Sequence, residues 1–361
     1  LLASSAASDV YKRQHLTCDE NGFAQTKDMP YGVYTVHQTV GWEGTEFIAD
    51  FDVNISKNGQ TYRYLINNAK FESYIKVVKV DSETGKTIPY EGAGFEIYDS
   101  NGQKISMTFS YPTPTTIDIF YTNSEGYLIT PEVLPYGEYS LVEVQAPYGY
   151  VLDSTPVYFD VAEEHSSDEG GITVIKVDKP NMAQKGTVSI EKTGEVFSGV
   201  NISGEENADV IYQPVYEVKG LAGAVYEITA AEDIITPDGT LRYAKGEVVD
   251  TVTTDENGLA KSKELYLGKY TVVEITAPEG MVINKEAHEV ELTYAGQEVS
   301  VTETATSFVN DRQKVTVSLE KTIEKNDIFN IGNGDEMKNI SFGLFAAEEL
   351  VSASGTSIPA D

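Results

Sequence analysis

Lysine and glutamate side chains at repeated positions of predicted β-strands are the candidates for chemistry in this sequence. Glu143 and Glu274 each lie six residues after a turn glycine, and Lys192 lies in a strand that opens one of the repeats. A carboxyl group held beside an amine can act as a general acid and base. A single lysine or glutamate on a strand is usually solvated, so these positions must be judged by the elements that hold them.

Other kinds of site are not indicated. The four histidines are widely scattered without metal-ligand spacing, so no metal site is predicted. The acidic segment 163–169 lacks the ligand spacing of a known calcium loop, and a solvated loop is favoured there. The sequence contains no nucleophile-elbow, phosphate-loop or dinucleotide motif. We therefore predict no cofactor and no ordinary enzyme activity. The single cysteine, Cys18, excludes an intramolecular disulfide framework.

An internal repeat organises the chain. Three turns closed by glycine align, at residues 17–24, 122–127 and 253–260. A second turn glycine follows ten or eleven residues later, and a strand follows it each time, at residues 34–38, 139–143 and 270–274. The sixth residue after the second glycine is polar in every copy: Gln38, Glu143 and Glu274.

Opening strands are predicted ahead of the second and third copies, at residues 75–81 and 188–193, and for a fourth copy at 317–322, whereas the first copy lacks its opening strand. Short strands at regular spacing with glycine, proline, asparagine and aspartate turns indicate β-sandwiches. The predicted fold class is all-β, with tandem immunoglobulin-like or prealbumin-like sandwich modules. The expected parts are a non-native leader (1–14), the C-terminal part of module 1 (15–70), module 2 (71–182), module 3 (185–312) and a truncated module 4 (313–361).

Charge limits the partners. The net charge is −31, from 57 acidic and 26 basic residues. Such a surface repels phosphate backbones and anionic membranes, so no nucleic-acid or lipid partner is expected. No apolar run approaches 18 residues, so no membrane-spanning segment is predicted.

Several segments together resemble the SpaA-type, CnaB-like domains of Gram-positive pilins and surface adhesins. They are residues 76–81 with the Thr-Gly-Lys turn at 84–86, the Gly-Ala-x-Phe segment at 92–95, and residues 139–143 followed by 146–150. The resemblance implies a prealbumin-like sandwich, an extracellular location on a Gram-positive cell wall, and attachment through sortase.

The resemblance also implies an intramolecular isopeptide bond. In many members a lysine on the first strand joins an Asn or Asp on the last strand, assisted by a glutamate on a middle strand. In module 3 the matching residues are Lys192, Glu274 and Asn310. Val188 and Ile190 share a strand face with Lys192, which would point the lysine toward the core.

In module 2, Glu143 matches the glutamate and Asp178 the partner. The separation from Glu143 to Asp178 is 35 residues and that from Glu274 to Asn310 is 36. Lys76 and Lys79 are both candidates for the lysine. The family pattern places the reactive lysine three residues before the lysine of a Lys-x-Asp motif, so Lys76 is favoured.

The chemistry is physically reasonable in a buried site. Burial disfavours the charged forms of lysine and glutamate, a neutral amine can attack, and adjacent strands hold the reacting groups together. Module 1 departs from the pattern, because Gln38 replaces the glutamate while Asn67 keeps the partner position, so no bond is predicted there. Lys321 is a candidate lysine in module 4.

The predicted function is therefore that of a structural cell-surface protein, a pilin or adhesin stalk with self-catalysed Lys–Asn/Asp crosslinks. The alternative is an extracellular module that binds a host protein or glycan through its loops. The aromatic-rich stretch 109–121 is the candidate contact loop, although such stretches are more often packed hairpins.

Overall fold

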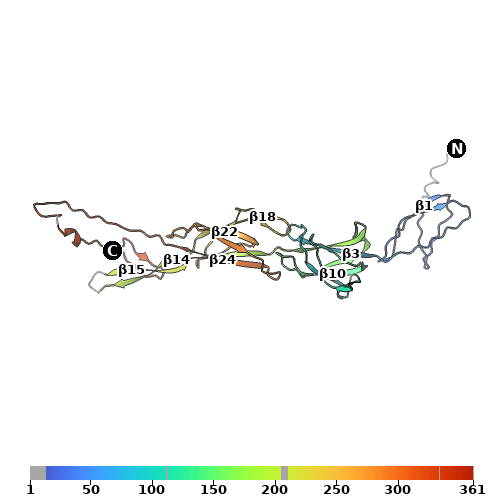
Figure 1. Cartoon of the computed structure of the whole chain (residues 1–361), viewed down its shortest axis with the longest axis horizontal. Helices are drawn as coiled ribbons and strands as arrows, with labels where there is room; N and C mark the ends of the chain where they lie inside the picture. The colour runs from blue at the N-terminus through green and yellow to red at the C-terminus, as the bar shows by residue number, and fades with distance from the viewer. Residues whose placement is uncertain (1–13, 111–112, 205–209, 333, 361) are drawn as a thin grey trace, which may run out of the picture.

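The chain is a row of β-modules. The computed structural model describes residues 14–110, 113–204, 210–332 and 334–360. The predicted leader and the tip of the 109–121 stretch lie almost wholly outside these ranges. The modules follow one another along the long axis, from β1 at one end to β15 at the other (Figure 1). The only helical segments in the described ranges are the 3₁₀ turns η2 (Glu163–His165) and η3 (Glu336–Asn339), which confirms the all-β prediction.

Module 2 is a sandwich of two sheets. One sheet has the order β11-β10-β4-β7, with the bounds β11 (Val157–Val161), β10 (Gly137–Gln145), β4 (Gly94–Asp99) and β7 (Phe120–Tyr121). The other has the order β12-β13-β3-β8, with β9 also paired to β3; the bounds are β12 (Ser166–Glu169), β13 (Ile172–Asn181), β3 (Glu72–Asp81), β8 (Tyr127–Ile129) and β9 (Leu134–Pro135).

Strand alternation builds the core of module 2. On β3, Ile75 and Val77 are fully buried, and Lys79 follows on the same face. Ile75 and Val77 pack with Phe95 and Leu141 of the opposite sheet in one apolar cluster. The last strand, β13, runs parallel to the first, β3. This pairing brings the two ends of the module's sequence into one sheet.

Module 3 repeats this plan. Its first sheet is built on β14, with the bounds β14 (Lys185–Ser203), β15 (Ile211–Gly220), β20 (Leu259–Lys261), β21 (Leu265–Tyr266) and β24 (Val301–Asn310). Its second sheet has the order β19-β16-β22-β23, with the bounds β19 (Val248–Thr253), β16 (Val225–Ala230), β22 (Gly268–Thr276) and β23 (His288–Leu292). The first and last strands, β14 and β24, are again parallel neighbours.

Apart from the β1–β2 pair of module 1, the described residues form three two-stranded hairpins outside the sandwich sheets. The 109–121 stretch contributes to the hairpin of β5 (Met107–Phe109) and β6 (Thr115–Ile117). A second hairpin joins β17 (Ile234–Ile235) and β18 (Leu241–Tyr243). The third, β25 (Leu350–Val351) with β26 (Ser357–Ile358), lies beside the extended part of β14.

The two outer segments of the chain contain less sheet. In the described part of module 1, β1 (Gly32–Val36) pairs with β2 (Phe51–Ile55). In module 4, the opening strand expected at 317–322 is not formed, and Val317 and Leu319 are exposed. In modules 2 and 3 the opening strand is held between a parallel last strand and an antiparallel partner, and residues 313–360 provide neither of these neighbours. Among the described residues, no helix is long and apolar enough to cross a membrane.

Candidate functional site

A buried lysine, glutamate and asparagine meet in the core of module 3. Lys192, Glu274 and Asn310 are each at most 2% exposed. The Lys192 Nζ atom lies 3.1 Å from Glu274 Oε1 and donates a short hydrogen bond to Asn310 Oδ1. The Asn310 amide Nδ2 lies 3.0 Å from both carboxylate oxygens of Glu274. The structure thus brings together the three residues that the sequence predicted for this module.

The strands of module 3 explain this convergence. On β14, Val188, Ile190 and Lys192 alternate onto the core face, as expected. In the parallel pairing of β14 with β24, Lys192 lies opposite Phe308, so Asn310 follows two residues later on the same face. Glu274 reaches the pair from the other sheet, where it is opposite Tyr226.

Module 2 contains the same arrangement with Lys79, Glu143 and Asn181. All three are at most 1% exposed. Lys79 Nζ lies 3.1 Å from Glu143 Oε1 and donates a short hydrogen bond to Asn181 Oδ1, while Asn181 Nδ2 donates to Glu143 Oε2 at 2.7 Å. The strand pairing is also equivalent, because Lys79 lies opposite Lys179 and Asn181 comes two residues later.

The prediction that Lys76 and Asp178 form the reacting pair of module 2 is therefore wrong, because the structure places neither residue in the buried site. Lys76 lies on the opposite face of β3, where its ammonium contacts Glu169 and lies 4.9 Å from the centre of the Tyr127 ring. Asp178 is about half exposed and pairs with Lys176 at 2.9 Å. A shift of an odd number of residues along a strand moves a side chain to the other face. Lys76 is three residues from Lys79 and Asp178 is three residues from Asn181, so both side chains face away from the buried site.

The signal for the correct residues was present in the sequence. The alternation Ile75, Val77, Lys79 corresponds to the alternation Val188, Ile190, Lys192 that identified the lysine in module 3. In module 2 the family spacing selects Lys76 instead, which lies on the other face of the strand. Asn181 had no equally clear signal, because the segment from Glu143 to the end of β13 is two residues longer than its counterpart in module 3.

Burial changes the electrostatics of both lysines. Removal from water lowers the pKa of Lys79 to about 8, against the opposing effect of the Glu143 carboxylate. Burial also lowers the pKa of Lys192, and Glu274 opposes that shift. A lowered pKa means that less free energy is required to form the neutral amine, which is the nucleophilic form.

The polypeptide backbone orients the glutamates. The amide of Asp153 donates to Glu143 Oε2 at 3.1 Å, and the amide of Asn284 donates to Glu274 Oε2 at 2.6 Å. In module 2 the asparagine is held as well, because its Nδ2 donates to the Val151 carbonyl at 2.8 Å. Each carboxylate therefore faces its lysine and asparagine in a fixed position.

The two sites differ in one neighbour. Module 3 has Phe308 two residues before the asparagine, and Lys192 Nζ lies 5.8 Å from the centre of its ring. Module 2 has the buried Lys179 there, whose ammonium binds Asp153 at 3.0 Å and the Thr155 carbonyl at 2.8 Å. The charge of Lys179 contributes to the lower pKa of Lys79, after the larger effect of burial. Sequence reasoning did not identify Lys179.

Modules 1 and 4 lack this arrangement in the described residues. The Gln38 side chain accepts a hydrogen bond from Asn68 Nδ2 at 2.8 Å, so Asn68 rather than the expected Asn67 lies beside it. Lys321 of module 4 is exposed. Within the described ranges, no three histidine, cysteine, aspartate or glutamate side chains form a candidate metal site.

Comparison with known proteins places these two sandwiches in a family. The family model of the SpaA prealbumin-like fold domain matches residues 73–176 and 215–307. This chain belongs to the SpaA prealbumin-like family. Its two matched SpaA segments include the sheets that carry both glutamates.

Relatives of the SpaA modules occur in Gram-positive bacteria. The trypsin-resistant surface T6 protein of Streptococcus pyogenes is 34% identical over 86 residues, which are 23% of this chain and 16% of that protein. Serine-aspartate repeat-containing protein C of Staphylococcus aureus is 26% identical over 277 residues, which are 76% of this chain and 25% of that protein. The chain thus spans a quarter or less of these relatives.

Solved structures similar to the chain include two Gram-positive proteins. The Bacillus anthracis TIE protein has a TM-score of 0.39 at 23% identity, covering 82% of this chain and 45% of that one. A streptococcal ancillary pilin has a TM-score of 0.26 at 17% identity, covering 79% of this chain and 76% of that one.

Proposed function

We propose that the chain is a stalk segment of a Gram-positive cell-surface protein, a pilin or adhesin, in which modules 2 and 3 are each closed by a self-catalysed Lys–Asn isopeptide bond. The observation that carries this proposal is the duplicated buried triad. In both modules a lysine of the first strand meets an asparagine of the last strand beside a glutamate. Two buried charges without a further role would be costly to retain in each core.

The reaction needs no cofactor. In module 2, the Lys79 ammonium transfers a proton to Glu143, whose oxygen lies 3.1 Å away, and the neutral Nζ attacks the Asn181 side-chain carbonyl carbon. Glu143 returns its proton to the departing amide nitrogen, to which it is already hydrogen-bonded, and accepts the second proton from Nζ. The Nζ–Cγ bond forms, the Cγ–Nδ2 bond breaks, and ammonia leaves. The same steps apply to Lys192, Glu274 and Asn310.

The product suits a protein under tension. Each bond would join the first strand directly to the last strand of its module, so pulling on the chain would not separate these strands. The bond would also replace a buried ammonium by a neutral amide, which removes the cost of keeping that charge out of water.

The relatives support a cell-surface location, since one of them is named a surface protein. The net charge of −31 suits an exposed, soluble segment. We propose attachment to the cell wall through sortase in the parent protein, with a host protein or glycan as partner. The alternative function is that this segment itself binds the host protein or glycan through the β5–β6 hairpin. No contact of the described residues favours this function over that of a stalk.

The intact mass of the folded protein tests the proposal. Each Lys–Asn bond releases one ammonia, so two bonds lower the mass by about 34 Da from the sequence value. Tandem mass spectrometry of a digest should find one branched peptide pair joined at Lys79 and Asn181 and another joined at Lys192 and Asn310. An unshifted mass would rule out both crosslinks. A loss of about 18 Da from one module would instead indicate an aspartate partner such as Asp178.

The rate of crosslinking in module 2 should depend on pH in a way that identifies the role of Glu143. The reactive state, with a neutral amine and a protonated glutamate, carries the same single proton as the Lys79–Glu143 ion pair. Because the pKa of Lys79 is about 8, raising the pH above that value removes this shared proton. We therefore expect a rate that is constant near neutral pH and falls about tenfold per pH unit above pH 8.

An Asn310→Ala background isolates module 2 for this measurement. The chain is recovered in urea from inclusion bodies, where it has not folded and the bond has not formed, then refolded by dilution at each pH, quenched in acid, and weighed by mass spectrometry over time. A rate that rises through pH 8 would contradict the proton-donor role and show that Glu143 acts only as a base.

A further inference from the structure

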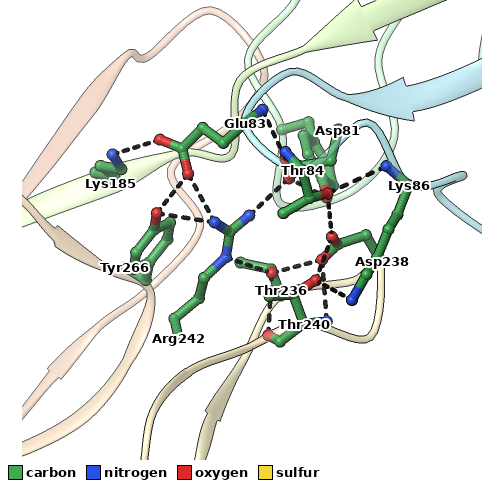
Figure 2. A network of polar contacts seen from close by, with 11 residues as sticks. Asp81, Glu83, Thr84, Lys86, Lys185, Thr236, Asp238, Thr240, Arg242 and Tyr266 are labelled. Carbon is green, nitrogen blue, oxygen red and sulfur yellow. Dashed lines mark hydrogen bonds and ion pairs between the residues drawn. The ribbon is translucent and has the colours of Figure 1, made fainter.

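The β17–β18 hairpin of module 3 contacts module 2 rather than completing a sheet of its own module. Figure 2 shows the Arg242 side chain of β18 at the centre of a polar network that joins the two modules. Its Nη2 lies 2.9 Å from Asp81 Oδ2 and its Nη1 lies 2.8 Å from Glu83 Oε2. The guanidinium carbon is 4.6 Å from the centre of the Tyr266 ring, within the range of a cation–π contact. The Arg242 side chain is only 9% exposed and that of Asp81 is buried.

A second carboxylate at the joint belongs to module 3 and accepts a hydrogen bond from module 2. Asp238, in the turn of the β17–β18 hairpin, accepts a hydrogen bond from Thr84 of module 2 at 2.8 Å. It also accepts bonds from Thr236 and Thr240 within its own turn, both at 2.6 Å. Burial acts to raise the pKa of Asp238, but these hydroxyl groups outweigh it and hold the pKa at about 2. The contact between the modules is therefore ionised throughout the physiological pH range.

A separate set of contacts holds the other side of the joint. Gln297 of module 3 accepts a hydrogen bond from the Ala146 amide through its side chain and from the Leu152 amide through its carbonyl, both at 2.9 Å. The Tyr148 and Tyr294 rings pack with their centres 4.6 Å apart. Contacts at several places around a short connection limit rotation as well as bending.

The joint is built directly on the candidate crosslinking strands. Asp81 is two residues beyond Lys79 on β3 and lies opposite Asn181 on β13. Its carboxylate also accepts a hydrogen bond from the Tyr150 hydroxyl at 3.0 Å. Arg242 thus attaches module 3 to the first strand of module 2, at the end where the last strand leaves for β14.

The same hairpin recurs at the next joint. Residues 346–348 repeat the Ala-Ala-Glu of residues 230–232. Residues 354–356 (Ser-Gly-Thr) repeat residues 238–240 (Asp-Gly-Thr) at the same spacing. The turn hydrogen bonds match as well, from Thr236 N to the Thr240 carbonyl and from Ser352 N to the Thr356 carbonyl. The β25–β26 hairpin contacts the β14–β15 extension, where the Ala353 amide donates to the Phe197 carbonyl at 2.9 Å. In both joints the hairpin of one module contacts the C-terminal part of the first strand of the preceding module, at Asp81 of β3 and at Phe197 of β14.

We infer that this hairpin is a module-docking element, which binds the preceding module and holds modules 2 and 3 in one fixed orientation, with Arg242 as its principal contact. A guanidinium suits this role because its separate N–H groups bind two carboxylates while its face covers an aromatic ring. The inference does not depend on whether the isopeptide bonds form. Its function is to make the two modules a rigid unit of the stalk rather than two flexibly linked domains.

The distance between spin labels on the two modules tests this inference. The full chain with Cys18→Ser would carry labels at Tyr158→Cys of module 2 and Glu289→Cys of module 3, both at exposed strand positions. Pulsed electron paramagnetic resonance should give one narrow distance peak. Arg242→Ala should replace this peak by a broad distribution, and Arg242→Lys should not restore it, because an ammonium cannot bind both carboxylates in this geometry.

Arg312→Ala is a matched control. Arg312 also pairs with a carboxylate, Glu195 at 3.2 Å, and lies 3.9 Å from the centre of a tyrosine ring, but its contacts are within module 3. Its removal should leave the narrow peak unchanged. Asp81→Asn and Glu83→Gln weaken the joint from the module 2 side, so broadening in these variants excludes misfolding of module 3 as the cause. A narrow peak in Arg242→Ala, or a broad one in the unmodified joint, would overturn the inference.

Discussion

Replacing Asn310 by alanine is expected to lower the unfolding free energy of module 3 by about 5 kcal/mol and its melting temperature by roughly 10–20 °C. The proposed bond joins residues that are 118 positions apart. By analogy with disulfides, a covalent link across a loop of this length restricts the unfolded chain strongly, whereas the folded strands are already in contact. Differential scanning calorimetry of the full chain should show the shift in one transition and leave that of module 2 in place.

Three variants separate the covalent bond from ordinary packing. Asn310→Asp should still react, with loss of water instead of ammonia, and should keep most of the stability. Lys192→Met combined with Glu274→Gln removes both buried charges together with the bond, so a stability loss in this double variant cannot result from an unpaired charge. Lys261→Ala is the control for a surface lysine, because Lys261 pairs with Glu303 at 3.2 Å and is about half exposed. If this double variant melts at the temperature of the unmodified protein, the bond does not contribute as proposed.

Repetition made the fold and one of the two sites accessible from sequence. The turn glycines and the strands behind them define sandwiches whose opening and closing strands could be located, and the family resemblance matched Lys192, Glu274 and Asn310 to positions on these strands. Alternation along β14 points Lys192 inward because a side chain at every second position faces the same layer. The same rule selects Lys79 on β3, whereas the family spacing selects Lys76, which faces away from the core.

Other features depend on contacts that no local pattern encodes. The parallel pairing of β3 with β13 fixes which residue lies opposite Lys79. The segment from Glu143 to its partner is two residues longer than that from Glu274 to Asn310, so spacing alone does not identify Asn181. Arg242 and Asp81 are 161 residues apart. From sequence alone, an arginine in a short hairpin is expected to be exposed to solvent. Only the packing of one module on the next shows that both are buried.

The glutamates provide the second large effect. Glu143→Gln should slow crosslinking of module 2 by about 10²–10⁴-fold, because an amide cannot accept the proton from Lys79 and return it to the leaving nitrogen. Glutamine has nearly the shape of glutamate, so it can still accept the hydrogen bond from the Asp153 amide that holds this side chain. The fold should therefore persist, while the loss of about 17 Da relative to the calculated mass of the variant should be absent for module 2, because the ammonia stays on Asn181.

The duplication supplies an internal control for this result. Glu274→Gln should remove the mass loss of module 3 alone, and the double variant should have the mass calculated from the sequence. Lys76→Ala should leave the mass loss of module 2 intact, because Lys76 faces Glu169 on the other side of β3. If Glu143→Gln still reacts at the rate of the unmodified module, proton transfer by this carboxylate is not required. Burial of the lysine beside the asparagine would then account for the reaction by itself, and Lys179→Met would become the decisive variant, because Lys179 is the other charge that lowers the pKa of Lys79.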